Sequence, residues 1–288
     1  MEKNFLRSLG AFGFDPLEPI VLASLISEDP LLLIGKAGTG KTFLLNSLSE
    51  ALGLEHRHYN ASLLSFDDLV GFPMPSPDGG SVNFLPTPAT IWGAESVLID
   101  ELSRCKPETQ NKLFSVIHER KIQGIDLPGL RYRWAAMNPL NRADESEADR
   151  YSGSIALDQA LADRFAWIVS VPDWAELPDA DQQLVIDPSG ENKINTASGE
   201  LAASIAELRR EFLAATERCH PDVVTYCRVT ATLLGKAGFR ISPRRARLMA
   251  RNLTSLMIAA NHLGHSVTGK QRDALFRLCL RWSVPQRA

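Results

Sequence analysis

The sequence predicts an α/β fold followed by an all-helical region, and three observations support this prediction. Short, nearly continuous apolar runs recur through the first two thirds of the chain, as in a parallel sheet that helices cover on both faces. Helical patterns separate these runs, which is the alternation of an α/β domain. After about residue 175 the strand signals stop, and apolar residues recur at spacings of three and four. We therefore expect an αβα domain over residues 1–174 and a helical domain over residues 175–288.

Each element of this prediction has its own signal. The buried strands are expected at the apolar runs 31–35, 97–100, 132–137 and 167–171. A helix is expected over 107–120, because Pro107 suits a first helical position and Leu113, Val116 and Ile117 form an apolar stripe. A stretch rich in Pro, Asp, Asn and Gly from residue 172 predicts a linker that contains one short helix. The helices of the second domain are expected near 201–215, 222–236, 243–263 and 269–282.

The composition excludes several classes of protein. The 288 residues are 44% hydrophobic and 23% charged, as in a globular protein, and the formal net charge of -3 does not indicate a dedicated nucleic-acid binder. No apolar run approaches the roughly 18 residues of a membrane-spanning helix. Four cysteines without a paired C-x-x-C spacing favour free thiols over disulfides or a zinc site. Together with the lack of a signal-peptide core, these features predict a cytoplasmic protein without membrane insertion.

The segment GKAGTGKT matches the phosphate-binding pattern G-x-x-x-x-G-K-[ST], and it lies between a strand signal and a helix signal. Its glycines let the backbone wrap closely, so that successive N–H groups can point at phosphates. Lys41 is expected to hold the β and γ phosphates, and the Thr42 hydroxyl is expected to ligate Mg²⁺. The predicted nucleotide-binding residues are Gly35, Lys36, Ala37, Gly38, Thr39, Gly40, Lys41 and Thr42. A chance glycine-rich turn is the alternative, which the flanking strand and helix disfavour.

Polar residues end the next two predicted strands. Asp100 is expected to be the second Mg²⁺ ligand, and Glu101 is expected to be the base or polarising partner for an attacking water. Two adjacent acids could instead cap the following segment. Asn138 before Pro139 could be a turn former, or it could hydrogen-bond both the water and the terminal phosphate. Glu101 favours a hydrolase, because a kinase acting on a small molecule does not need it.

These motifs together resemble a known family. GKAGTGKT, VLIDEL, AAMNP, ALADRF and ISPRRA occur in the order and spacing of an AAA+ ATPase core. The segments RCKPETQ (104–110), YSG (151–153) and LADRF (161–165) are similar to the MoxR branch, and the match runs over about residues 17–282. The resemblance implies an AAA+ P-loop core with a five-stranded parallel sheet of order 5-1-4-3-2, flanked by helices, and a C-terminal helical lid. It also implies that Asn138 is sensor 1, Arg164 the arginine finger and Arg244 the sensor 2 arginine.

The resemblance implies a function as well. A MoxR-like protein is a Mg²⁺-dependent ATPase that hydrolyses ATP between the subunits of a homo-oligomeric ring, here expected to be a hexamer. It remodels or activates a protein partner, often a separate von Willebrand factor A domain protein. One alternative is a nucleic-acid motor or restriction and defence ATPase that resembles MCM-type helicases, although the sequence does not indicate nucleic acid. Another is a nucleotide-controlled assembly switch, against which Glu101 argues.

Several residues have two interpretations. Arg164 could pair with its neighbour Asp163 rather than face a phosphate. Arg244 in a first helical turn would oppose the helix dipole, so an anionic ligand explains it better than stability does. The weaker candidates for action on a neighbouring site, or for solvated loop residues, are Arg104, Arg142 and Arg150. Hairpins are expected over 71–88 and 120–134, either as contacts to a substrate or as ordinary surface hairpins. His56 and His58 are assigned to structure, because a third metal ligand is missing.

Overall fold

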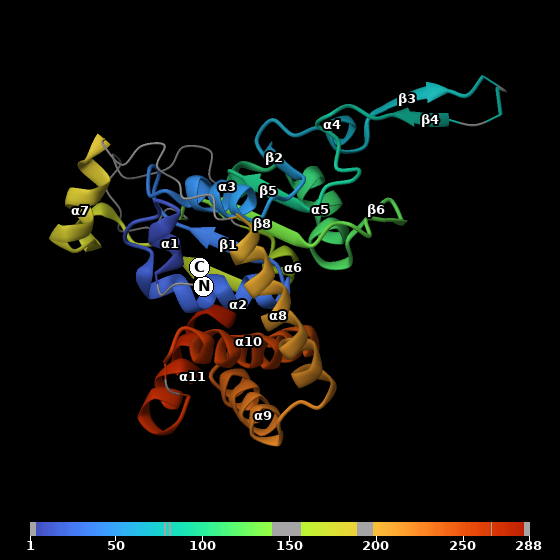
Figure 1. The fold of residues 1–288 in the computed structure, drawn as a ribbon. Helices are drawn as coiled ribbons and strands as arrows, with labels where there is room; N and C mark the ends of the chain where they lie inside the picture. Colours follow the sequence, from blue (N-terminus) through green and yellow to red (C-terminus); the bar gives the residue numbers. More distant parts are fainter. Residues whose placement is uncertain are drawn as a thin grey trace.

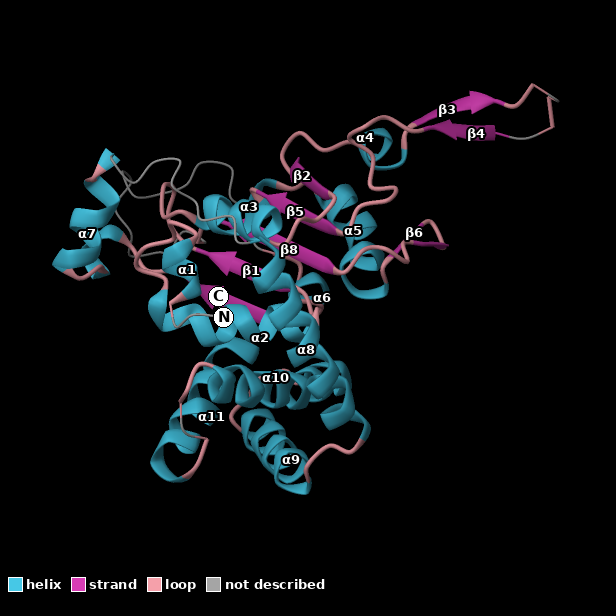
Figure 2. Ribbon diagram, viewed as in Figure 1, coloured by secondary structure: helices cyan, strands magenta, loops and turns pink. Residues whose placement is uncertain are grey.

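A five-stranded parallel sheet forms the centre of the molecule (Figures 1 and 2). The computed structural model describes residues 4–77, 79–80, 82–139, 157–188, 198–265 and 267–284. The strands lie in the order β2 (His56–Asn60), β5 (Ser96–Asp100), β8 (Tyr132–Met137), β1 (Leu31–Ile34) and β9 (Trp167–Ser170). All neighbouring pairs are parallel. Read from the β9 edge and counted along the chain, the order is 5-1-4-3-2, which confirms the expected topology.

Helices surround the sheet and continue beyond it. In the first part of the chain they are α1 (Phe5–Ser8), α2 (Glu18–Ser27), α3 (Lys41–Ala51), α4 (Phe66–Val70), α5 (Pro107–Glu119), α6 (Gln159–Ala162) and α7 (Asp179–Ile186). The C-terminal part holds α8 (Ser198–Glu217), α9 (Pro221–Lys236), α10 (Pro243–His262) and α11 (Gly269–Ser283). These last four form the predicted all-helical region, which lies below the sheet in Figure 1.

The alternation of side chains along the strands separates two hydrophobic cores. Leu31 and Leu33 of β1 lie in one core with residues of α2, α3 and the C-terminal helices. Leu32 between them lies in the other core, with residues of α4 and α5. This period of two is the geometry of a strand that is buried on both faces. Helix α10 packs closely against α2, so the first core runs without interruption from the sheet into the C-terminal helices.

Two short hairpins leave the sheet. Strands β3 (Phe72–Pro75) and β4 (Val82–Leu85) form an antiparallel pair that projects from the body, as expected for the segment 71–88 (Figure 1). The second hairpin, β6 (Lys121–Ile122) with β7 (Ile125–Asp126), is shorter than the range 120–134 predicted for it. The reason is that residues from Tyr132 onward pair with β5 and β1 inside the sheet. Within the described residues, no helix is both long and apolar enough to cross a bilayer.

Candidate functional site

The predicted phosphate loop joins the carboxyl end of β1 to the start of α3. Gly40 caps α3 with a φ of 79°, in the left-handed region where glycine carries no steric cost. Gly35 has no room for a side chain, because an added Cβ would lie 2.2 Å from Val171 Cγ2. Lys41 is only 7% exposed, and its ammonium group donates to the carbonyls of Gly35 and Lys36 at 2.7 Å each. Burial lowers the pKa of Lys41, and the nearby Asp100 and Glu101 oppose that shift.

Thr42 and Asp100 meet beside this loop. The Thr42 hydroxyl donates to Asp100 Oδ2 at 2.7 Å, which joins α3 to the end of β5. Burial would raise the pKa of Asp100, but hydrogen bonds from His58, Thr42 and the Glu101 N–H together lower it. The carboxylate is therefore kept ionised. A hydroxyl and an ionised carboxylate at this spacing are the hard oxygen ligands that Mg²⁺ prefers, so the pair fits the metal predicted for it.

His58 belongs to this group, although its sequence pattern indicated only a structural role. Its Nε2 lies 3.5 Å from Asp100 Oδ2. The contact arises because β2 pairs with β5 in a register that sets Asn60 opposite Asp100 and His58 two residues earlier on the same face. His56 has the structural role that was expected, with its ring nitrogens 2.8 Å from Ser96 Oγ and 3.1 Å from Asn46 Oδ1.

Glu101 stands in a strained position at the end of β5. Its φ of 55° is left-handed, which is uncommon for a residue with a side chain. Its Oε2 atom is buried and accepts no hydrogen bond, although Arg104 Nε lies 3.3 Å away in an ion pair without hydrogen-bond geometry. Arg104, considered for action on a neighbouring site, thus contacts the predicted base of its own chain. A carboxylate oxygen without a hydrogen bond, on a residue with an uncommon backbone conformation, is typical of functional sites.

Asn138 follows β8, next to the loop. The Gly35 N–H donates to the Met137 carbonyl at 3.2 Å, so the residue after Met137 lies at the same edge of the sheet as the phosphate loop. Asn138 is 5% exposed. The carboxyl ends of parallel strands are where ligands bind in open α/β sheets, and Asp100, Glu101 and Asn138 all lie there.

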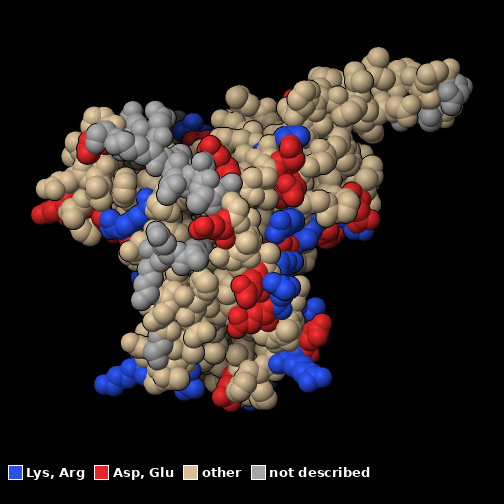
Figure 3. Space-filling view, in the orientation of Figure 1, with Lys and Arg blue, Asp and Glu red and all other residues tan. Residues whose placement is uncertain are grey.

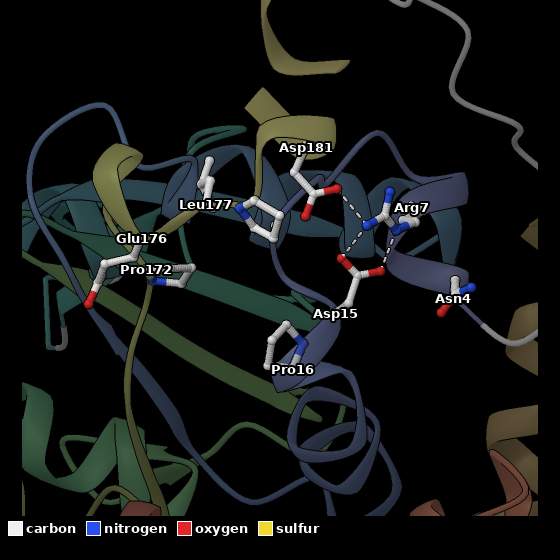
Figure 4. A pocket seen from close by; sticks show the side chains of 10 residues that line it. Asn4, Arg7, Asp15, Pro16, Pro172, Glu176, Leu177 and Asp181 are labelled. Carbon is white, nitrogen blue, oxygen red and sulfur yellow. Dashed lines mark hydrogen bonds and ion pairs between the residues drawn. The ribbon is translucent and has the colours of Figure 1, made fainter. Parts of the chain in front are cut away.

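Two segments that were not expected to belong to the site form a cavity of about 530 Å³. Its lining comes from residues 4–16 and from the stretch after β9, namely Asn4, Arg7, Gly13, Asp15, Pro16, Pro172, Glu176, Leu177, Pro178 and Asp181. Figure 4 shows Arg7 between Asp15 and Asp181, and its Nη2 lies 2.6 Å from the Asp181 carboxylate. The phosphate loop contacts the second of these segments, because Lys36 pairs at 2.8 Å with Asp173, which follows the lining residue Pro172. The volume suits a small-molecule site.

Arg164 lies at the opposite end of the sheet. It precedes β9, where the backbone N–H groups of Ala166 and Trp167 donate to the Pro30 carbonyl, just before β1 begins. Its guanidinium donates to the Ala160 carbonyl at 2.6 Å and stacks 4.4 Å from the centre of the Phe114 ring. Its Nε atom is buried without a hydrogen-bond partner. Burial and then the nearby Arg244 lower its pKa.

Arg244 lies beside Arg164 rather than beside the phosphate loop of its own chain. It occupies the first turn of α10, as predicted, and its Nη1 pairs with Asp163 Oδ2 at 3.4 Å. Asp163 therefore supplies a stabilising contact for Arg244 within its own chain, and the expectation that an anionic ligand explains this arginine better than stability does stays a prediction. Asp163 also pairs with Arg245, so it is not the partner of Arg164 that its position in the sequence suggested. Arg142 and Arg150 lie outside the described residues.

Arg245, absent from the predicted site, is the better anchored of the two arginines. It is fully buried, and it donates to the carbonyls of Ala162, Phe165 and Ser283 at 2.8 to 2.9 Å. Burial lowers its pKa, opposed by Asp163. Two adjacent arginines have the same chemistry in a sequence, and only the helical position that turns one of them inward distinguishes them.

Comparison with known proteins fits this geometry. Residues 30–165 match the family model described as AAA domain (dynein-related subfamily). This segment, just under half of the chain, is therefore similar to an AAA domain. The match begins just before β1 and ends just after Arg164, so the matched segment contains the phosphate loop, Asp100, Glu101 and Asn138, while Arg244 and Arg245 lie outside it.

The structural comparison extends beyond the AAA domain. A crystal structure from Cytophaga hutchinsonii, provisionally described as an ATPase, is similar over 95% of this chain and 84% of that chain, with a TM-score of 0.62 and 17% identity. At this identity the likeness concerns the fold alone, and it includes the C-terminal helices. The fold is common, with 374 matching chains of known structure, so it does not choose among functions. No curated protein matches the sequence.

Proposed function

We propose that the protein is a MoxR-like AAA+ ATPase that hydrolyses ATP at the interfaces of a homo-oligomeric ring, and that the ring is a hexamer. The observation that carries this proposal is the separation of its charged groups. The phosphate loop and Asp100 follow the carboxyl ends of β1 and β5, whereas Arg164 precedes the amino end of β9. Strand β9 spans four residues, or about 13 Å, and lies between the two. An arginine at the amino end serves a phosphate on a neighbouring subunit far more easily than its own.

The roles at the carboxyl end follow from the local geometry. Lys41 would exchange its contacts to the loop carbonyls for the β and γ phosphates. Thr42 and Asp100 would hold Mg²⁺, which supplies charge neutralisation at the phosphates when it is bound. Glu101 would accept a proton from the attacking water through its carboxylate, and Asn138 would orient that water. The cavity beside the loop has room for the base and sugar of the nucleotide.

Arg164 and Arg244 would complete the site of the adjacent subunit. Both side chains are only partly buried and lie close together at the amino end of the sheet, so their positive charges fall on one part of the molecule. An arginine supplied to a developing phosphate charge accelerates turnover by about 10³ to 10⁵ where such fingers are known. A subunit without its neighbour should therefore be a very slow ATPase.

The use of ATP hydrolysis to remodel a partner protein is proposed from the resemblance to the MoxR branch. Movement of the C-terminal helices relative to the sheet would pass to a client protein or to a separate von Willebrand factor A domain partner. This part of the proposal depends on the ring, so the ring is tested first.

The test mixes two inactive variants of the full chain. Lys41→Ala lacks the phosphate contact but keeps Arg164, whereas Arg164→Ala keeps the phosphate contact. In a mixture, some interfaces combine an intact loop with an intact arginine, and we expect turnover to reappear there. Specific activity of the unmodified protein should also rise with its concentration. Arg247→Ala is the matched control, since Arg247 is exposed on α10 and should leave activity unchanged.

Two results would contradict the proposal. The first is activity that does not change with concentration in a protein shown to be monomeric. The second is a mixture that stays inactive although both variants assemble with the unmodified chain. In either case Arg164 acts within its own chain or only structurally, and the protein is a solitary nucleotide-binding unit.

A further inference from the structure

Strands β3 and β4 form a hairpin, here called the arm, whose described residues are exposed and uncharged over most of its length. None of its described residues is Lys, Arg, Asp or Glu, and Figure 3 shows it as an uncharged projection from a charged body. Phe72, Met74 and Leu85 are each more than half exposed. Their pairing sets all three on one face of the arm. A monomeric protein rarely exposes such residues together, so the arm has the character of a contact surface.

The register of the arm determines where its backbone hydrogen bonds go. Phe72 lies opposite Leu85, Pro73 opposite Phe84, and Met74 opposite Asn83. In an antiparallel pair, alternate residues exchange both of their backbone bonds with the partner strand. Proline has no N–H, so Pro73 and Pro75 cannot be the bonded residues. The bonded pairs are therefore Phe72 with Leu85 and Met74 with Asn83.

It follows that the two outer edges of the arm differ. On the outer edge of β3, the positions that point outward are Pro73 and Pro75, which offer no donors and present their rings to any approaching strand. On the outer edge of β4, Val82 and Phe84 point outward with both N–H and C=O intact. Among the described residues, no third strand pairs with either edge. The arm thus has one blocked edge and one open edge.

We propose that the open edge of β4 receives an extended, uncharged segment of a partner protein as a third strand. Backbone hydrogen bonds to Val82 and Phe84 would supply directionality, and the exposed Phe72, Met74 and Leu85 would contact alternate side chains of the segment. The absence of charge on the described part of the arm disfavours a nucleic acid as the occupant, because nucleic-acid binding depends on contacts to phosphates. The inference names the partner class for the remodelling role proposed above and rests on that role.

The open edge is short, so each arm should bind weakly. Strand addition here involves about two outward-facing residues, each contributing a modest net gain. Several arms in one ring would hold one long client together, because the second contact becomes intramolecular. Binding by an isolated subunit is therefore expected to be weak, and to depend on the backbone N–H groups of the peptide.

The experiment measures peptide binding by the full chain in the presence of Mg-ADP, without turnover. The probe is a fluorescent peptide of about ten residues that alternates Thr and Val, a composition that favours extended strands. A second peptide has the same side chains but carries an N-methyl group on every backbone nitrogen, so it cannot donate a hydrogen bond along either edge. The protein variants are Phe84→Pro, which removes the outward N–H, and Phe84→Val, which keeps it.

The proposal expects the first peptide to bind and the N-methylated peptide to bind about tenfold more weakly or worse. Phe84→Pro should weaken binding to a similar extent, and Phe84→Val should change it by less than about threefold. Hydrogen exchange at residues 82 and 84 should slow when the first peptide is bound. The two peptides give a comparison on unmodified protein, so the result does not depend on how a proline variant folds.

Equal binding of the two peptides, or full binding by Phe84→Pro, would overturn the proposal, since the contact would then be apolar only. The proposal would also fall if neither peptide bound, or if the arm paired with a second copy of the chain instead. Because ATP turnover is not measured here, such a failure would leave the subunit-mixing experiment on Arg164 unaffected. Conversely, loss of the ring would not remove strand addition by a single subunit.

Discussion

Glu101 carries the clearest expectation at the scale of single residues, because its Oε2 atom is buried without a hydrogen bond. Replacing it with Gln keeps the shape of the side chain but removes the base. We expect Glu101→Gln to bind ATP as before and to hydrolyse it about 10² to 10⁴ times more slowly. Single-turnover assays and the nucleotide retained after gel filtration would measure this. Glu108→Gln, an exposed change on α5, is the control, and normal turnover in Glu101→Gln would remove the assignment.

The lowered pKa of His56 predicts how the free energy of unfolding depends on pH. Burial, followed by the positive charges of His58 and Arg57, lowers its pKa from 6.5 to about 4. The unfolded chain therefore binds a proton on this residue below about pH 6.5, while the folded protein does not until about pH 4. The free energy of unfolding should fall as pH decreases through this window, by on the order of 2 kcal/mol for this residue.

Chemical denaturation of His56→Asn at several pH values tests this sign. The variant cannot take up the proton, so its stability should decline less steeply between about pH 6.5 and 4 than that of the unmodified protein. His262→Asn, an exposed change on α10, should keep the original slope. An identical slope in His56→Asn would show that other groups account for the acid sensitivity.

Element boundaries were largely predictable, because they depend on local signals. The four apolar runs became β1, β5, β8 and β9, and Pro107 begins α5 as its fixed φ predicts. The extent of the second hairpin was not predictable, because the residues from Tyr132 onward pair with β5 in the sheet and not within the hairpin. Such competition between local pattern and tertiary pairing is a usual source of error at strand ends.

Contacts between distant elements were the other limit. The approach of His58 to Asp100 depends on the register of β2 against β5, and a sequence does not state its register. The cavity beside the phosphate loop joins residues 4–16 with residues 172–181, and no spacing rule connects them. Residue types and motif order, by contrast, were sufficient to predict a loop between β1 and α3 with Asp100 and Asn138 at the ends of neighbouring strands. The metal-binding role of Thr42 and Asp100 and the role of Glu101 as base stay predictions.

Gly71 sets the base of the arm and gives a prediction at the scale of one element. Its φ is 98°, and an added Cβ would lie 2.2 Å from the Leu85 carbonyl oxygen. We expect Gly71→Ala to strain the start of β3 by roughly 1 to 3 kcal/mol. Hydrogen exchange of the β4 amides should accelerate as a result. Gly80→Ala, at a position with open space near the tip, should leave that exchange unchanged, and equal effects of the two changes would contradict the prediction.

At the scale of the whole molecule, two ion clusters join the C-terminal helices to the part of the chain that forms the sheet. In one, Asp163 contacts Arg244 and Arg245 at the start of α10. In the other, Glu28 is 3% exposed and pairs with Arg131 at 2.8 Å and with Arg209 of α8 at 2.7 Å. Both clusters lie at the amino end of the sheet, away from the phosphate loop. Movements driven by ATP would therefore have to pass through these charged contacts.

Removing one of these contacts should destabilise the whole protein. Arg245→Met would leave the carbonyls of Ala162, Phe165 and Ser283 without their donor, at a cost of about 3 to 5 kcal/mol. Calorimetry should record a fall in Tm on the order of 10 °C. Arg247 is exposed and lies two positions after Arg245 on α10. Arg247→Met should therefore change stability by less than about 0.5 kcal/mol. A fall in Tm no larger than that of this control would mean that Arg245 does not hold the two parts together.

The prolines of β3 have a consequence for how far such chains can associate. A hairpin with two open edges can add a copy on each side, and repeated addition produces a fibril. Because Pro73 and Pro75 block the edge of β3, the arm can add a strand only at the edge of β4, and growth of the sheet stops once that strand is in place. An arm whose described residues are apolar and uncharged can then be present at high local concentration without starting an aggregate.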